Sequence, residues 1–248
     1  MKNFWKIVNE VIAQSDIVLE VADARFPLES RNEELEKKVQ RAGKKLIIVL
    51  NKCDLVSKDL LDKIKRQVPD SVFVSSKDNF GTTILRKKIL AMAKKSEIVA
   101  GVVGYPNTGK SSIINILKHS AAAETSSQAG FTKGKRMVRV DKKLMLIDTP
   151  GVLQYREKDS SKLALLNAIS ASQVKEPDIA AAEIIEKFAK ENPNAFEKFY
   201  GIEPGEDAYE TLEEIGKRLR KFRKKGEIDI DSVSRKIIDD WQKGKLLL

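Results

Sequence analysis

The segment GYPNTGKS at 104–111 has the residue types and spacing of a loop that binds nucleoside phosphates. Its glycines let backbone N–H groups wrap around a phosphate, and the helix expected after the loop adds the favourable field of its N-terminus. Lys110 is expected to reach the β- and γ-phosphates, and the Ser111 hydroxyl to hold Mg²⁺. A glycine turn without a ligand is the alternative. The apolar run before the motif and the helical pattern after it favour the phosphate loop.

A second motif, LIDTPG at 146–151, follows about 40 residues after the phosphate loop. A carboxylate at the end of a buried strand is costly unless it is paired or lies near a metal. Asp148 is therefore expected to act on Mg²⁺ through water. The N–H of Gly151 is expected to contact the γ-phosphate, which would make the segment after it sensitive to the nucleotide state.

The motif NKCD at 51–54 predicts which base is bound. In the pattern N-K-x-D, the carboxylate of Asp54 accepts hydrogen bonds from guanine N1–H and from the exocyclic amino group. Adenine lacks that pair of donors, so GTP and GDP are the expected ligands. Asn51 and Lys52 are expected to brace the loop and cover the base, whereas Cys53 occupies the variable position and packs.

Two further segments complete the expected nucleotide site. After the strand-like run 71–75 comes a companion loop that would contact the guanine carbonyl, formed by Ser75, Ser76 and Lys77. The polar, glycine-containing segment 126–136 has the composition of a mobile switch. Thr132 in it is the preferred candidate for a switch threonine that closes on Mg²⁺, and Thr125 is the alternative.

The first two thirds of the chain provide the elements that must position these loops. Short runs rich in Val, Ile and Leu alternate with helical patterns, which predicts a doubly wound, mostly parallel α/β sheet. The strands are expected over 17–23, 45–50, 71–75, 97–104, 136–140 and 143–148, and the helices over 31–42, 57–67, 82–94 and 111–119. The strand 136–140 alternates basic and apolar residues, so it is expected at an edge of the sheet.

The pattern becomes helical throughout from about residue 175. Residues 1–174 are therefore predicted to form the nucleotide-binding domain, and 175–248 a small all-helical C-terminal domain. Apolar spacing and turn residues predict its helices over 180–191, 195–201, 208–226 and 231–244. Asp178 and Asp231 are placed as N-caps of two of them.

The composition bears on which partners, metal clusters and membrane segments the chain could have. The net charge is +10, and the run 217–225 holds seven basic residues in nine, which favours contact with the phosphate backbone of structured RNA. A solvated charged surface is the alternative. One Cys and one His exclude a disulfide framework and a Cys/His metal cluster. No run approaches the ~20 apolar residues that span a bilayer, and the first residues do not read as a signal peptide. We therefore expect a cytoplasmic monomer without a membrane partner.

The order of these motifs along the chain is unusual. Ordinary small GTPases place the phosphate loop first and N-K-x-D late, whereas here NKCD and SSK precede the phosphate loop. The permutation leaves the site intact because all these loops lie at the carboxyl ends of the strands. Together with VADARFP at 21–27 and SRN at 30–32, the order resembles the circularly permuted GTPases of the ribosome-biogenesis group, the YlqF/RbgA and nucleolar GTPase relatives.

The resemblance covers nearly the whole chain and implies a GTPase that assists assembly of the large ribosomal subunit and contacts rRNA. It implies that Asn107 helps hold K⁺ near the phosphates, and the alternative is that Asn107 only shapes the loop. Arg25 is expected to be structural, paired with Asp23 or with a neighbouring loop. The nucleotide-binding set is then Asn51, Lys52, Cys53, Asp54, Ser75, Ser76, Lys77, Asn107, Thr108, Gly109, Lys110, Ser111, Ser112 and Gly151, with Asn107, Lys110, Thr132 and Gly151 acting in catalysis and Ser111, Thr132 and Asp148 on the metal.

Val152 stands where many GTPases place a glutamine that orients the attacking water. An aliphatic side chain cannot do this, so unaided hydrolysis is expected to be slow and to need help from a partner or a cation. Two alternatives stay open. One is a nucleotide-gated RNA-binding scaffold with negligible turnover, and the other is a GTPase of another pathway.

Overall fold

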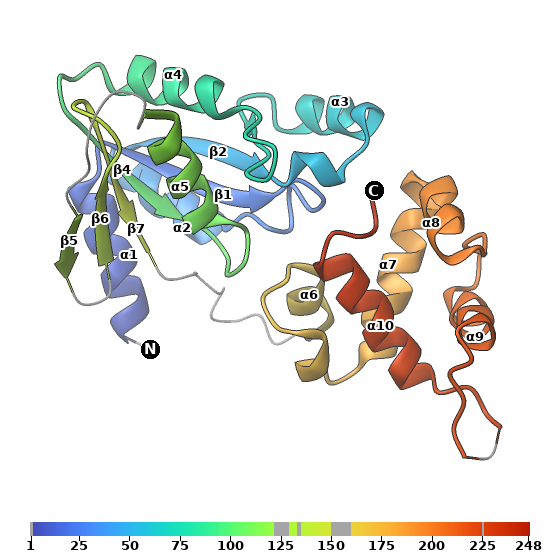
Figure 1. Ribbon diagram of the computed structural model, residues 1–248. Coiled ribbons are helices and arrows are strands. Elements are labelled where there is room, and N and C mark those ends of the chain that lie inside the picture. Colours follow the sequence, from blue (N-terminus) through green and yellow to red (C-terminus); the bar gives the residue numbers. More distant parts are fainter. Residues whose placement is uncertain (1, 122–128, 133–134, 150–159, 225) are drawn as a thin grey trace. The chain divides into compact units, whose positions relative to one another are not determined.

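The computed structural model describes residues 2–121, 129–132, 135–149, 160–224 and 226–248 (Figure 1). The chain divides into two compact units. The first consists of Met1–Asp54 and Leu61–Gln154, and the second of Leu55–Leu60 and Tyr155–Leu248. Gly151, Val152 and Thr125 lie outside the described residues.

The described strands of the first unit form one seven-stranded sheet in the order β3-β2-β1-β4-β7-β6-β5. Neighbours are parallel from β3 to β7, and the last two strands are antiparallel. The predicted mostly parallel α/β sheet is therefore confirmed. The strands are β1 (Ile17–Asp23), β2 (Lys45–Asn51), β3 (Val72–Phe73), β4 (Ile98–Val103), β5 (Ala129–Thr132), β6 (Lys135–Arg139) and β7 (Leu144–Asp148).

The edge position predicted for the strand 136–140 is wrong. This strand is β6, which pairs with β7 on one side and with the short β5 on the other. β5 includes a glycine and lies in the segment whose composition suggested a switch, so its pairing could not be read from local pattern. Once it forms, β5 takes the edge of the sheet.

Helices cover both faces of the sheet, as Figure 1 shows. On one face, α1 (Lys2–Gln14) and α2 (Glu33–Arg41) bury their apolar side chains against Val18 and its neighbours. On the other, α4 (Thr82–Ala93) and α5 (Lys110–Ala121) pack on residues that alternate with Val18 along β1: Ile17, Leu19 and Val21. Successive side chains of a strand point to opposite faces, so the fully buried β1 contributes to both cores.

The second unit is helical in its described part and packs around a group of aromatic side chains. Phe188 lies 5.5 Å from Phe196 and 6.0 Å from Trp241 between ring centroids, and Trp241 donates from Nε1 to the Leu165 carbonyl at 3.0 Å. The elements are α3 (Lys58–Gln67), which begins in this unit, then α6 (Ser160–Leu165), η2 (Ala171–Gln173), α7 (Pro177–Glu191), α8 (Pro193–Tyr200), α9 (Ala208–Arg218) and α10 (Ile230–Gln242), with η1 (Cys53–Leu55) where the two units meet along the chain.

Three helix boundaries predicted here are wrong. The helix expected over 208–226 ends at Arg218, and the chain then turns back so that Phe222 forms a β-bridge with Ile228. Asp178 is not a cap, because Pro177 takes the first helical position, where its missing N–H costs nothing. Asp231 is not a cap either, because the side chain of Asp229 accepts from the N–H of Ser232 at 3.2 Å.

Candidate nucleotide-binding site

The predicted site residues come from loops that follow four parallel strands. The phosphate loop follows β4 and leads into α5, Asp148 ends β7, the segment 51–54 begins at the last residue of β2, and the companion loop follows β3. Since the carboxyl ends of parallel strands lie at one edge of a sheet, these loops share that edge.

The backbone of the phosphate loop leaves no room for side chains at its glycines. Gly104 has φ of +143°, and a Cβ there would lie 2.2 Å from the carbonyl oxygen of Val21. At Gly109, with φ of +93°, a Cβ would lie 2.1 Å from Nδ2 of Asn51. Asn107 has φ of +57°, in the left-handed region that asparagine tolerates better than most residues. The backbone of the phosphate loop thus packs directly against Val21 and Asn51 at its two glycines.

Lys110 is folded against this loop. Its Nζ donates to the carbonyl of Tyr105 at 2.6 Å, and the Thr108 hydroxyl donates to the same carbonyl at 2.9 Å. Lys110 is 6% exposed, and burial lowers its pKa to about 8, with a partial offset from the negative charge of Asp148. A nearby phosphate would stabilise the ammonium that burial penalises.

Ser111 and Asp148 lie together as metal ligation would require. The Ser111 hydroxyl donates to a carboxylate oxygen of Asp148 at 3.5 Å, and both residues line a pocket of about 110 Å³. Oxygen donors of this kind suit Mg²⁺, which is usually bound by one or two protein groups together with phosphates and water. In the ranges that the structure describes, no cluster of three or more His, Cys, Asp or Glu residues could hold a metal. As two neighbouring oxygen donors, Ser111 and Asp148 fit a metal ion that arrives with a phosphate ligand.

Asn51 joins three of the loops. Its side-chain amide is fully buried, donates to the Thr108 carbonyl at 2.8 Å, and accepts from the N–H of Ser76 at 3.2 Å. A single amide thus fixes the segment 51–54 against both the phosphate loop and the companion loop. Asp54 is half-buried beside it, while Lys77 is exposed.

The other predicted residues have simpler surroundings. Burial raises the pKa of the Cys53 thiol to about 11, in keeping with a residue that packs. Ser75 is buried, and its hydroxyl contacts Asp78 at 3.1 Å. Ser112 is exposed in the first turn of α5. For Thr132 the structure describes the backbone, in β5, and not the side chain.

The segment 23–25 contributes a contact that sequence reasoning missed. Arg25 pairs with Asp23, as expected, with Nη2 of the arginine 2.9 Å from Oδ2 of the aspartate. The same Oδ2 also lies 2.9 Å from Nζ of Lys52, in the segment 51–54 predicted to bind the base. This contact follows from the sheet order, which places β1 beside β2. No local sequence pattern indicates it.

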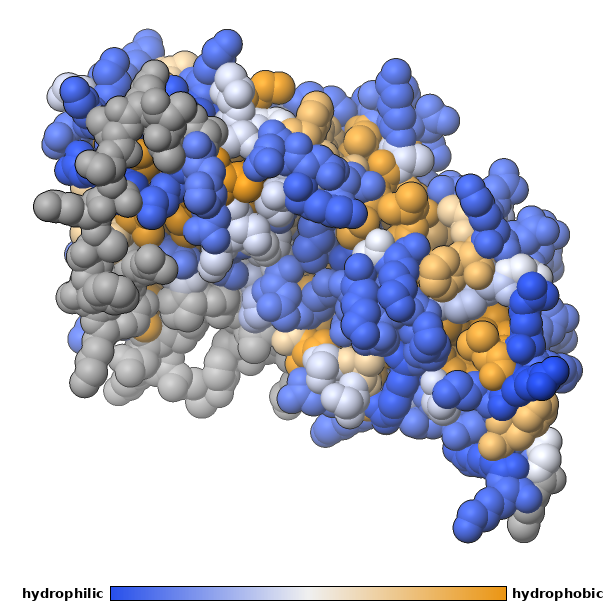
Figure 2. All heavy atoms as spheres, in the orientation of Figure 1, coloured by the Kyte–Doolittle hydropathy of each residue, from blue (hydrophilic) through white to orange (hydrophobic). Residues whose placement is uncertain are grey.

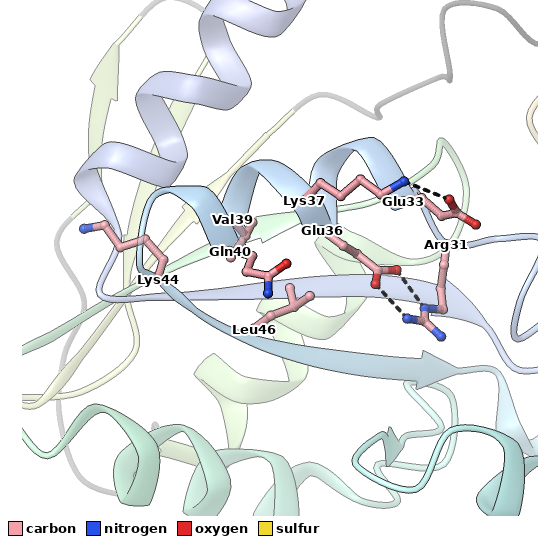
Figure 3. Close-up of a pocket in the computed structure, with 8 residues that line it drawn as sticks. All are labelled: Arg31, Glu33, Glu36, Lys37, Val39, Gln40, Lys44 and Leu46. Carbon is pink, nitrogen blue, oxygen red and sulfur yellow. Dashed lines mark hydrogen bonds and ion pairs between the residues drawn. The ribbon is translucent and has the colours of Figure 1, made fainter.

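A larger hollow of about 560 Å³ lies elsewhere, between α2 and β2 (Figure 3). Among its lining side chains, Arg31 pairs with Glu36 and Lys37 with Glu33. It contains none of the predicted nucleotide-binding residues. The fold therefore defines a P-loop protein in which the loops predicted to contact phosphate, metal and base share one sheet edge.

Comparison with known proteins identifies the family. A family model described as RsgA GTPase matches residues 7–157, and one described as 50S ribosome-binding GTPase matches residues 99–219. The chain belongs to the circularly permuted P-loop GTPases, as the order of its motifs predicted.

Individual relatives agree with this assignment. The chain is 43% identical, over 97% of its length and 65% of the relative's, to a GTP-binding protein of Methanocaldococcus jannaschii. It is 31% identical to nuclear GTP-binding protein NUG1 of Saccharomyces cerevisiae, over 99% of its length and 55% of the relative's. The chain thus spans from about half to about two thirds of the length of these curated relatives.

A solved structure shows the same fold. GNP-bound YlqF from T. maritima aligns with a TM-score of 0.63 and 22% identity, over 98% of this chain and 94% of that chain. Within the described ranges, no helix is long and apolar enough to cross a membrane.

Proposed function

We propose that this chain binds GTP and GDP with Mg²⁺, hydrolyses GTP to GDP and phosphate, and assists assembly of the large ribosomal subunit. The observation that carries the proposal is the buried amide of Asn51, which holds the base loop, the phosphate loop and the companion loop together. Such a connection suits one ligand that has both a purine base and phosphates.

Each loop has a task in this proposal. Asp54 accepts from guanine, Lys110 contacts the β- and γ-phosphates, and Ser111 and Asp148 hold Mg²⁺, the latter through water. Mg²⁺ neutralises charge on the phosphate oxygens when it is bound. From the sequence, the N–H of Gly151 and the hydroxyl of Thr132 respond to the γ-phosphate.

The chain itself supplies little to orient the attacking water. Val152 has no hydrogen-bonding group in its side chain, so we expect turnover on the order of 10⁻³ s⁻¹ or below without a partner. K⁺ held near Asn107 would assist, and the ribosomal particle would complete the site. With GTP, the chain would stay bound to the ribosomal particle. With GDP, it would be released from the particle.

The ribosomal role is supported by the family description that names the 50S ribosome, and by charge. In the second unit, the described residues 217–224 are all exposed, including Phe222, which is 50% exposed. They lie at the end of α9 and in the loop after it (Figure 1), a region where hydrophilic residues are prominent in Figure 2. We propose that this loop contacts the phosphate backbone of rRNA.

GTP turnover in potassium buffer, with and without purified large ribosomal subunits from a matched source, tests this function. Strong stimulation by the subunits, lost in Lys110→Ala, is the expected result. Tight GTP binding without stimulation would favour the nucleotide-gated scaffold, for which Val152 is the supporting observation. Affinity for ribosomal RNA should fall steeply with salt, and a flat response would argue against backbone contact.

A further inference from the structure

Asp23, Arg25 and Lys52 form a charged group, here called the Asp23 cluster, beside the guanine loop. Nε and Nη2 of Arg25 donate to the two carboxylate oxygens of Asp23 at 3.0 and 2.9 Å. Nζ of Lys52 donates to Oδ2 at 2.9 Å. The side chains of Asp23 and Arg25 are 0% exposed, whereas that of Lys52 is 19% exposed. The cluster is therefore a buried ion pair with one cation reaching the surface.

The backbone places this cluster against the base loop. Asp23 lies in register with Asn51 at the ends of β1 and β2, and the N–H of Ala24 donates to the carbonyl of Asn51 at 2.8 Å. Ser30 supports the turn from the other side, because its hydroxyl accepts from the N–H of Asp23 at 2.9 Å. The motifs at 21–27 and 30–32 thus converge on one residue, Asp23, with Ser30 bonded to its backbone and Arg25 to its carboxylate.

Lys52 needs support from outside its own segment. Its φ is +61°, in the left-handed region that residues with a Cβ rarely adopt. Such a conformation persists where surrounding contacts fix it. Its side chain has a fixed partner in Asp23. In the chain, Lys52 lies between Asn51, whose amide joins the loops, and Asp54, whose carboxylate is expected to bind guanine.

The electrostatics keep Asp23 charged for this contact. Burial by itself raises the pKa of Asp23, but the charges of Arg25 and Lys52 outweigh it and hold that pKa well below its ordinary value. The carboxylate is thus ionised at physiological pH. Arg25 forms two bonds with it in a fixed geometry, which leaves a defined position for the ammonium of Lys52.

We propose that Asp23 is a positioning residue for guanine recognition. Its carboxylate, oriented by Arg25, fixes Lys52 in the place from which that side chain covers the base. The inference rests on the proposed guanine site, because it assigns to the segment at 23–25 a task in that site. A purely structural role for the ion pair would instead contribute to folding without acting through Lys52.

A double-mutant cycle separates the two roles. GDP dissociation constants and thermal midpoints are measured for the full chain and for Asp23→Asn, Lys52→Met and the double variant. Each single change should weaken GDP binding on the order of tenfold, because it removes a buried charge-assisted contact. The double variant should bind no more weakly than Lys52→Met. The proposal would be overturned if Asp23→Asn weakened GDP binding equally in the unaltered chain and in the Lys52→Met variant. It would also be overturned if Asp23→Asn did not weaken GDP binding at all.

Asp141→Asn is the matched control. Asp141 is also a buried aspartate, 6% exposed and paired with an arginine, Arg86, but it belongs to the turn between β6 and β7. This variant should lower the thermal midpoint and leave GDP affinity within about twofold. A loss of GDP affinity as large as that of Asp23→Asn would overturn the proposal, since any buried ion pair would then have the same effect.

A second comparison serves if Asp23→Asn does not fold. Lys52→Arg keeps a cation that can pair with Asp23, whereas Lys52→Met does not, and both leave Asp23 paired with Arg25. Lys52→Arg should retain GDP affinity better than Lys52→Met by about fivefold or more. Equal affinities would overturn the proposal.

If the unaltered chain does not prefer GDP to ADP, the proposed guanine site itself fails. Preference for GDP together with an additive cycle would refute the inference about Asp23 alone.

Discussion

Replacing Asn51 by alanine should loosen the three loops that its amide holds together. The carbonyl of Thr108, a residue with no exposed surface, loses the donor at 2.8 Å and would cost about 1–3 kcal/mol if left unsatisfied. The half-buried N–H of Ser76 loses a longer bond of 3.2 Å, worth about 0.5–1.5 kcal/mol. The free energy of unfolding should therefore fall by about 1.5–4.5 kcal/mol.

Thermal unfolding and GDP titration measure the two consequences. This loss of stability corresponds to a decrease of about 3–18 °C in the melting temperature of a domain as long as the first unit. GDP affinity should fall by about tenfold or more, because the base loop and phosphate loop no longer share a bond; tenfold corresponds to about 1.4 kcal/mol.

Gln40→Ala is the matched control, since it removes an exposed amide from α2. It should change the free energy of unfolding by no more than about 0.5 kcal/mol and leave GDP binding unaltered. An Asn51→Ala protein as stable as this control, with full affinity for GDP, would refute the bridging role of the amide.

Four further outcomes are expected. Asp54→Asn should shift preference from GTP toward XTP, because an asparagine amide can donate to the extra carbonyl of xanthine, and competition binding measures this. Turnover should be faster in K⁺ than in Na⁺ if the resemblance at Asn107 carries over. GDP affinity should fall as pH rises through about 8, because Lys110 then loses the charge that phosphate binding needs. The nucleotide-free protein should gain stability between pH about 8 and 10.5, since the unfolded chain, with the higher lysine pKa, binds more protons there.

The first three of these have outcomes that would contradict them. Unchanged nucleotide preference in Asp54→Asn would mean that this carboxylate does not read the base. Equal turnover in both salts would exclude the cation role and leave Asn107 as a residue that shapes the loop. For the pH dependence, Lys110→Met is the control, and a parallel fall in GDP affinity in that variant would assign the titration to another group.

Local pattern was sufficient for most of the α/β scaffold. The apolar run 17–23 is β1 residue for residue, because a strand buried on both faces has a continuous apolar signal. Local pattern was not sufficient for the N-terminal ends of α7 and α10. Glu176 and Asp229 hold the N-cap positions predicted for Asp178 and Asp231, because a cap is decided by backbone geometry over a few residues.

The loops of the helical unit and the edge of the sheet depended on pairings that no local pattern shows. The turn after Arg218 brings Phe222 to Ile228, although the basic run continues a helical composition. β5 lies at the sheet edge through its pairing with β6. Both contacts join segments whose own sequences favour other structures, so tertiary contacts outweighed propensity.

The amino-acid sequence by itself determined the chemistry available to this protein and the family to which it belongs. The motifs and their permuted order are short, local patterns, and each requires particular residue types. Only the tertiary structure decided which loops touch. Asn51 meets Thr108 across 57 positions, and Asp23 meets Lys52 across 29. These contacts follow from strand order and register in the parallel sheet, which bring the ends of distant segments to one edge.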